Sequence, residues 1–300
     1  MCRPVVENTG PNQTASHASL RADLHSHSTA SDGTTSPADV MARAAAAGLD
    51  VIALTDHDTV AGHAEAAAAL PPGLTLLPGM ELSCRLSGHS VHVLAYLFDP
   101  ADDELTAEMA AIRDSRVSRA RAMVSRLAEL GAPVTWDQVT QIAGDGVVGR
   151  PHIARALAAA GVVATPADAF TPEWIGAGGR AHVTRYALDP MRAVALVRAA
   201  GGVTVLAHPR GAARGWQIPD EVLADLAAAG LTGVEVNHPQ QDAEQRARLQ
   251  ELAAALGLVP SGGSDDHGAL TGFRIGTEIA PPGGYAALVG QAAGARPVTG

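Results

Sequence analysis

The stretch His25-Ser-His27, followed by Asp32, is the first place in the chain where residue types and spacing suggest chemistry. The two histidines are two positions apart, so in a β-strand both side chains would leave the same face. Asp32 would follow from the loop just beyond the strand. Neutral imidazole and carboxylate are protein ligands of zinc, iron and manganese. This stretch therefore predicts part of a metal site.

Nine side chains of this kind lie at or near the ends of predicted strands. Side chains at the carboxyl ends of strands in an α/β barrel or sheet converge on one face, where binding sites are built. One ion takes about four to six ligands, so the pattern predicts two or three divalent ions of manganese, iron or zinc. The candidate metal ligands are His25, His27, Asp32, His57, Glu81, His92, His208, Asp265 and His267.

Taken singly, several of these residues have a simpler explanation. A lone histidine such as His63 or His152 is more often a packing or surface residue than a ligand, and the same holds for His92 alone in a strand. Asp56 and Asp58 could cap the helix that follows them. A chance origin would need nine independent coincidences of residue type and strand end, so we favour the metal cluster.

The elements that would position these residues are short apolar strands alternating with Ala-rich helices. This alternation predicts βαβ units and a parallel sheet, with a hairpin-like turn at Ser87-Gly88. Glu81 is expected near the end of the third strand. Residues 101–178 read instead as nearly all helix, including a long helix over about 102–130. The predicted organisation is a mobile N-terminal tail at 1–20, a discontinuous barrel domain at 21–100 and 179–300, and a helical insertion domain at 101–178.

Composition limits the class of protein. The 300 residues have a net charge of −10 and all basic residues are arginine, which disfavours binding to long duplex nucleic acid. No hydrophobic run approaches the length of a membrane span, and the first 20 residues do not resemble a signal peptide. Two cysteines argue against a disulfide framework and fit a reducing cytoplasm. We expect a cytoplasmic protein without an obligate protein partner.

Taken together, the motifs resemble those of the PHP (polymerase and histidinol phosphatase) superfamily over about residues 21–282. The resemblance implies an α/β fold, a distorted (β/α)7 barrel, with an all-helical insertion domain and a trinuclear metal site. The segment from Gly149 to Leu157 also resembles the branch of 3′,5′-nucleoside bisphosphate phosphatases and 5′-to-3′ exoribonucleases. The motifs are Asp23-Leu-His-Ser-His27, Ser31-Asp-Gly33, Thr55-Asp-His57-Asp, Gly79-Met-Glu81, His92, Ala207-His-Pro209 and Gly263-Ser-Asp-Asp-His267.

The same resemblance implies roles for the ligands. Asp265, His208 and Glu81 are the candidate catalytic residues, because adjacent ions lower the pKa of a bridging water and the leaving alcohol then needs a proton or a metal. Which group serves as the acid is left open. One ion would take His25, His27, Glu81 and Asp265; a second would take the bridging Glu81, His92 and His208; a third would take Asp32, His57 and His267.

Substrate contacts are expected from arginine. Arg113 and Arg116 fall within the apolar face of the helix predicted over 102–130, and Arg119 lies at its edge. Long arginine stems can pass a core to reach water. We favour inward guanidinium groups that bind phosphate, because the two pair in a bidentate way. Arg150, in the matching motif, is the fourth candidate.

Four residues receive weaker roles or none. Arg185 and Arg210 follow predicted strands and are weaker candidates for substrate contacts. His238 is left unassigned. Asp266 adds a charge between two predicted ligands, where an apolar residue would also be compatible.

The resemblance and the arginines lead to one preferred function. It is a metal-dependent phosphoesterase that removes the 3′-phosphate of nucleoside 3′,5′-bisphosphates, trims short 5′-phosphorylated RNA from its 5′ end, or does both. The substrate would be a small nucleotide or short oligonucleotide. One alternative is a phosphatase for histidinol phosphate or another small phosphomonoester, and a non-enzymatic alternative is a module that senses metal or nucleotide.

Overall fold

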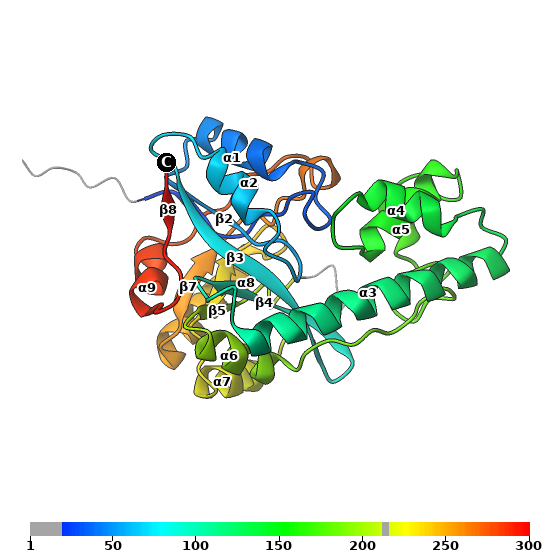
Figure 1. The fold of residues 1–300 in the computed structure, drawn as a ribbon. Helices are drawn as coiled ribbons and strands as arrows, with labels where there is room; N and C mark the ends of the chain where they lie inside the picture. The colour runs from blue at the N-terminus through cyan, green and yellow to red at the C-terminus, as the bar shows by residue number, and fades with distance from the viewer. Residues whose placement is uncertain (1–19, 212–215) are drawn as a thin grey trace, which may run out of the picture.

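Seven strands form a nearly closed, barrel-shaped sheet in the order β1 to β7, which confirms the predicted α/β barrel (Figure 1). The computed structural model describes residues 20–211 and 216–300. Apart from Leu20, the predicted N-terminal tail lies outside these residues. The strands are β1 (Ala22–Asp23), β2 (Val51–Leu54), β3 (Thr75–Leu86), β4 (His89–Tyr96), β5 (Val203–Leu206), β6 (Gly233–Asn237), β7 (Val259–Gly262) and β8 (Val298–Thr299).

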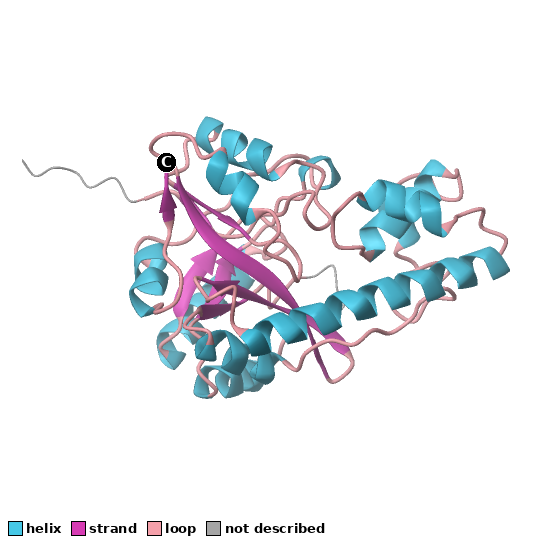
Figure 2. Cartoon of the chain, viewed as in Figure 1, coloured by secondary structure: helices cyan, strands magenta, loops and turns pink. Residues whose placement is uncertain are grey.

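Helices surround the sheet and begin where the sequence supplies capping groups (Figure 2). Ser36 caps α1 and Pro37 occupies its first turn, because the fixed φ of proline suits that position. Asp102, Asp189 and Asp242 cap three others. The helices are α1 (Pro37–Ala46), α2 (His63–Ala68), α3 (Asp103–Glu129), α4 (Trp136–Ala143), α5 (Arg150–Ala159), α6 (Pro190–Ala199), α7 (Asp220–Ala228), α8 (Ala243–Leu256) and α9 (Gly284–Gln291), with 3₁₀ turns η1 (Pro166–Ala169) and η3 (Gly268–Leu270).

The sheet is mixed rather than purely parallel, which corrects the sequence prediction. β4 runs antiparallel to both β3 and β5, whereas the other neighbours along the barrel are parallel. The reason is the turn at Ser87 and Gly88, both with positive φ, which returns the chain directly. β3 pairs with β2 only up to Pro78 and with β4 from Gly79 onward. Glu81 therefore lies within β3 but just beyond the end of β2, not at the end of its own strand.

The barrel closes between the first and last strands of the path. The amide of Leu24 donates to the carbonyl of Gly262 at 3.1 Å, and the amide of Asp265 donates to the carbonyl of His25 at 2.8 Å. A side chain at Gly263 would meet the backbone nitrogen of His25 at 2.4 Å. Glycine is thus required there for the two strand ends to approach.

The long helix α3 links the barrel to the helices that follow it (Figure 1). Leu105, Met109 and Ile112 in its first half are buried with barrel residues. Its second half, including Met123 and Leu127, is buried with residues of α4 and α5 instead. These elements lie between β4 and α6 in the chain. The assignment of residues 101–178 to a separate domain stays a prediction.

Two elements near the C-terminus were not predicted. Helix α9 has eight residues and includes Gly284 and Gly290, which weaken a helical pattern. Strand β8 has only two residues and pairs antiparallel with β3, where Thr299 lies opposite Thr75. Such short segments carry no readable periodicity.

Candidate metal centre

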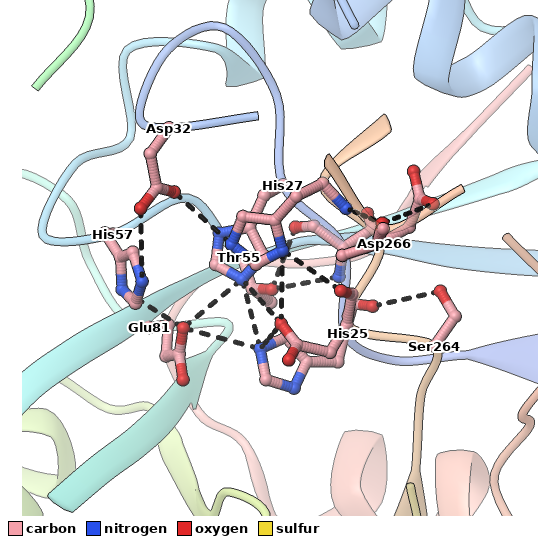
Figure 3. A network of polar contacts seen from close by, with 12 residues as sticks. His25, His27, Asp32, Thr55, His57, Glu81, Ser264 and Asp266 are labelled. Carbon is pink, nitrogen blue, oxygen red and sulfur yellow. Dashed lines mark hydrogen bonds and ion pairs between the residues drawn. The ribbon is translucent and has the colours of Figure 1, made fainter. Parts of the chain in front are cut away.

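All nine predicted ligands lie together at one rim of the barrel, and Figure 3 labels His25, His27, Asp32, His57 and Glu81 among them. Those from parallel strands follow the strand ends, as expected. His92 instead lies near the beginning of β4, because an antiparallel strand presents its amino-terminal half to this rim. His25, His27 and Asp32 follow β1, His57 follows β2, Glu81 lies in β3, His92 in β4, His208 follows β5, and Asp265 and His267 follow β7.

The carboxylate of Glu81 is the centre of this cluster (Figure 3). It is almost fully buried and lies within salt-bridge distance of five imidazoles. The distances are 3.5 Å to His25 and 3.2 Å to His27, 3.1 Å to His57, 2.5 Å to His92 and 3.1 Å to His208. A carboxylate in this position can serve two ions through its two oxygens.

Four ligand atoms match the size of a tetrahedral ion site. Nε2 of His25 and Nε2 of His27 lie 3.2 Å apart. The same atoms lie 3.5 and 3.2 Å from Oε2 of Glu81 and 3.4 and 3.3 Å from Oδ1 of Asp265. A tetrahedron with ligands about 2.1 Å from the ion has edges of about 3.4 Å. The side chains therefore fit an ion without rearrangement.

The remaining ligands form looser groups. His92 and His208 both face Oε1 of Glu81. Asp32 lies 3.4 Å from Nε2 of His267 and 3.8 Å from Nε2 of His57. Ligand atoms of His27 also lie close to this last group. The grouping resembles the predicted division among three ions, and that division stays a prediction.

Charge in the cluster is balanced between carboxylates and imidazoles. Burial acts to raise the pKa of Glu81, but nearby His92, His57 and His25 hold it well below its usual range. Burial also acts to raise the pKa of Asp265, but His25 and His267 hold it well below its usual range. Burial alone would lower the pKa of His27, yet hydrogen bonds to Asp265 and Glu81 raise it to about 10. A bound cation would take the place of the protons that the imidazoles hold beside these carboxylates.

Two further observations fit the same chemistry. Nδ1 of His27 is buried without a hydrogen-bond partner, which is costly for a ring nitrogen that has no other ligand. Nδ1 of His57 lies 3.1 Å from Oε2 of Glu81 and has no other partner. His208 and Asp265 have positive φ values of 30° and 50°. Residues other than glycine in this region store strain, which is common at functional sites.

The sequence analysis missed Glu235, which lies in β6, and left unassigned His238, which directly follows that strand. This strand supplies none of the nine predicted ligands. Glu235 is fully buried; its Oε1 accepts from Nδ1 of His25 at 3.1 Å and its Oε2 from the amide of His208 at 2.7 Å. Nε2 of His238 donates to Oδ2 of Asp265 at 3.2 Å, while its Nδ1 accepts from the amide of Gln240. Each holds a predicted ligand in place, as metal-binding histidines require. The available signal was a lone acidic residue inside an apolar strand.

Several residues with weaker predictions have structural roles. Asp56 does not cap a helix; it accepts from the hydroxyls of Ser28 and Ser31. Asp266 accepts from the amides of Arg274 and Gly268 and so orders the loop after β7.

Two other side chains organise helices. Nδ1 of His152 accepts from the amide of Gly149 and fixes the start of α5. Oδ2 of Asp58 accepts a hydrogen bond from Nε of Arg116 at 2.7 Å and lies 2.6 Å from Nη2 of the same side chain. Asp58 therefore anchors α3 and does not cap α2.

A cavity of about 320 Å³ opens beside the cluster and is rich in arginine. The predicted ligands Asp32, His57 and His92 belong to its lining, and Asp32 is the only carboxylate among the described lining residues. The pKa of Arg119 is lowered to about 8, mainly by burial and then by repulsion from Arg116, Arg185 and Arg150. A guanidinium holds its proton tightly, so an anion in the cavity would relieve this repulsion. We call this space the arginine cavity; its arginines are Arg85, Arg116, Arg119, Arg150 and Arg185.

Three of the four arginines predicted to contact the substrate line this cavity, and the fourth does not. Arg116, Arg119 and Arg150 line it, and Nε of Arg119 is buried without a hydrogen-bond partner. Arg113 lies outside it and donates to the backbone carbonyl of Asp58 at 3.2 Å. Arg185 lines the cavity. Arg210 does not line the cavity and pairs with Asp220 instead. Arg85, which no sequence pattern had marked, also lines the cavity.

Known proteins share both the sequence and the fold. Residues 23–131 match the family described as PHP domain. A 5′-3′ exoribonuclease of Haemophilus influenzae is 36% identical over 246 residues, which are 82% of this chain and 89% of that protein. The chain belongs to the PHP family. A 3′,5′-nucleoside bisphosphate phosphatase of Chromobacterium violaceum is 35% identical over 87% of this chain and 92% of that protein.

A solved structure extends the comparison to three dimensions. A Bifidobacterium adolescentis protein, described as a metal-dependent phosphoesterase, superposes with a TM-score of 0.85 at 35% identity, covering 91% of this chain and 97% of that one. As a PHP protein, the chain is a hydrolase of phosphoric esters with side-chain clusters that could bind metal. Among the helices of the described residues, none combines the length and hydrophobicity needed to cross a membrane.

Proposed function

We propose that this PHP protein cleaves the bond between a nucleoside 3′-oxygen and phosphorus when the same nucleoside carries a 5′-phosphate. Both 3′,5′-nucleoside bisphosphates and 5′-phosphorylated RNA contain this arrangement. The observation that carries the proposal is the arginine cavity, which opens directly onto the predicted metal ligands Asp32, His57 and His92. One phosphate would occupy the cluster and a second the arginines.

The arginine cavity would hold the 5′-phosphate. Arg119 offers a buried Nε with no partner in the protein. Arg116 is oriented by Asp58 and by the hydroxyl of Ser83, to which its Nη2 donates at 2.6 Å. Arginine groups fixed in this way bind phosphate oxygens at a small cost in side-chain entropy.

The cluster would hold the scissile phosphate. Divalent ions held by the nine predicted ligands would supply an activated water and positive charge for the phosphate oxygens. Glu81 holds the central histidines together, and Glu235 and His238 orient His25 and Asp265. His208 and Asp265 are the candidates to pass a proton to the leaving 3′-oxygen.

The first test compares substrates on the manganese-reconstituted protein. Adenosine 3′,5′-bisphosphate should release inorganic phosphate, and a 5′-phosphorylated RNA should release mononucleotides stepwise. Adenosine 3′-monophosphate should react with a higher KM, because it leaves the arginines unpaired. Asp265→Ala is the inactive control. Equal kcat/KM for the bisphosphate and the 3′-monophosphate would contradict the proposal.

The second test removes one arginine contact. Arg119→Gln should raise KM for the bisphosphate by about 10- to 100-fold, the range expected for one charged hydrogen bond. Arg121→Gln is a matched control, because Arg121 is exposed on the same helix and lies over the ring of Trp136. The effect of Arg119→Gln should be much smaller with adenosine 3′-monophosphate. The same loss on both substrates would place Arg119 elsewhere in the reaction.

The cavity also argues against histidinol phosphate as the substrate. Histidinol carries a cationic amine, which the five arginines of the cavity would repel. Histidinol phosphate should therefore be hydrolysed much more slowly than the bisphosphate. A sensing module without turnover would bind the bisphosphate and release no phosphate in the first test.

A further inference from the structure

A second cavity opens on the other part of the same cluster. Its volume is about 540 Å³, within the range of about 300–1,000 Å³ typical of small-molecule sites. It shares Asp32, His57 and His92 with the arginine cavity, and it also reaches Glu81, His208, Asp265 and His267. Phe170 borders both spaces. A phosphate at the cluster would therefore face two adjoining cavities.

The lining of the second cavity differs from that of the first. Ala154, Pro166, Ala167, Phe170 and Leu270 give it an apolar wall, and the side chains of Phe170 and Leu270 are exposed by 42% and 38%. Every nucleobase has a flat π-face, so a base can stack on exposed side chains of this kind.

Arg274 is the single arginine among the described residues that line the second cavity. Its Nη2 donates to the backbone carbonyl of Asp265 at 2.8 Å, which places the guanidinium beside the cluster. Its Nε is buried without a hydrogen-bond partner. A single guanidinium with an unused donor can donate a hydrogen bond to one phosphate or ribose oxygen. The several arginines of the arginine cavity suit a terminal phosphate, which carries more charge.

The chemistry of RNA trimming requires such a second space. In a bisphosphate, the scissile phosphorus carries the 3′-oxygen of one nucleoside and otherwise only terminal oxygens. In RNA, one of those oxygens carries the next nucleoside. If the first 5′-phosphate occupies the arginines, this next nucleotide must leave the cluster by another route.

We propose that the second cavity is the subsite for the nucleotide on the 3′ side of the scissile phosphate, so that RNA is a true substrate of this site. The proposal rests on the proposed function. Water adds to phosphorus, the bond from phosphorus to the 3′-oxygen breaks, and that oxygen takes a proton. The shortened RNA keeps the phosphate as its new 5′-phosphate. This new end is the group that the arginine cavity would bind in the next round.

Bulky substitutions in each cavity test the subsite. Ala167→Trp would fill the second cavity, and Ala177→Trp would fill the arginine cavity; both alanines are exposed lining residues. The substrates are adenosine 3′,5′-bisphosphate and a 5′-phosphorylated diadenylate. Ala167→Trp should lower the ratio of kcat/KM for the diadenylate to that for the bisphosphate by roughly tenfold or more, the loss of one stacked base. Ala177→Trp should lower both values together.

A second variant guards against a local packing defect. Leu270→Ser removes an exposed apolar side chain without adding bulk, and the same ratio should fall. An equal loss on both substrates in Ala167→Trp and Leu270→Ser would place the first nucleoside in the second cavity and overturn the proposal. Unchanged kinetics in both variants would also overturn it. Absence of turnover by the unmodified protein on both substrates would instead overturn the proposed function, and this subsite with it.

Discussion

At the scale of single residues, the cluster depends on groups that are not themselves predicted ligands. Glu235 fixes two of them with one carboxylate, through the ring of His25 and the backbone of His208. Burial acts to raise the pKa of Glu235, but His25 and His238 keep it below its usual value. The carboxylate is therefore charged where it orients His25.

Glu235→Gln should weaken metal binding about 10- to 100-fold, as is typical when a residue that orients a ligand is lost. The amide can accept from only one of its two present donors. The measurement is competition for manganese or zinc against a chromogenic chelator. Glu251→Gln is the matched control, because Glu251 is exposed on α8. Unchanged affinity in Glu235→Gln would show that His25 needs no such support.

Removal of metal should destabilise the protein as well as stop turnover. A ligand that binds only the folded state adds about 2.7 kcal/mol at a hundred times its Kd. Dialysis against a chelator should therefore lower Tm by several degrees, and manganese should restore both Tm and phosphate release. In Asp265→Ala, manganese should not restore phosphate release. An unchanged Tm after treatment with the chelator would contradict the assignment of the cluster as a metal centre.

At the scale of elements, α3 is held to the barrel by a buried ion pair. Asp58 is fully buried, and besides Arg116 it accepts from the amide of Ser83 at 2.7 Å. Burial acts to raise the pKa of Asp58, but Arg116 and then Arg185 lower it. The pair thus joins the barrel rim to the helix that carries part of the arginine cavity.

Asp58→Asn should lower the free energy of unfolding by about 3–5 kcal/mol at pH 7, because it leaves Arg116 buried beside a neutral group. The folded pKa of Asp58 is depressed, so its stabilisation is present above the unfolded pKa of about 3.9 and is lost as pH falls through the folded pKa. Urea unfolding should show a constant difference from pH 7 to about 5 and a smaller one below about 4. Asp103→Asn, exposed at the start of α3, should show little change at any pH. A difference that grows on acidification would exclude the ion pair as its cause.

The elements show what the sequence could reveal and what it could not. The periodic strands and helices and the nine candidate ligands could be predicted, because ligand types recur at strand ends. Glu235 was missed because its role depends on an atomic contact with a residue 210 positions away. Arg113 and Arg116 share one helical face, but only the neighbouring Asp58 decides which of them lines the cavity. β8 and α9 were too short to show a period.

At the scale of the whole molecule, charge is distributed unevenly. The net charge is −10, yet five arginines surround one cavity. The field of the net charge is largely screened by salt beyond the Debye length of about 8–10 Å. The arginines act on a bound phosphate at contact distance.

These two effects predict opposite responses to salt. If the arginine cavity dominates, KM for adenosine 3′,5′-bisphosphate should rise between low and moderate ionic strength, and more steeply than KM for adenosine 3′-monophosphate. Steady-state assays over a range of potassium chloride concentrations would measure this. If repulsion by the net charge dominated, KM would fall as salt is added.

The closure of the barrel also sets the order in which the site can be completed. His25 and His27 lie near the beginning of the chain, and Asp265 and His267 near its end. Contacts between residues so far apart form only after a large loop has closed. During synthesis, the tetrahedral group of His25, His27, Glu81 and Asp265 cannot exist until β7 and the loop that follows it have left the ribosome. An ion that binds this group would therefore be acquired late in the life of the nascent chain, and metal bound earlier would occupy an incomplete set of ligands.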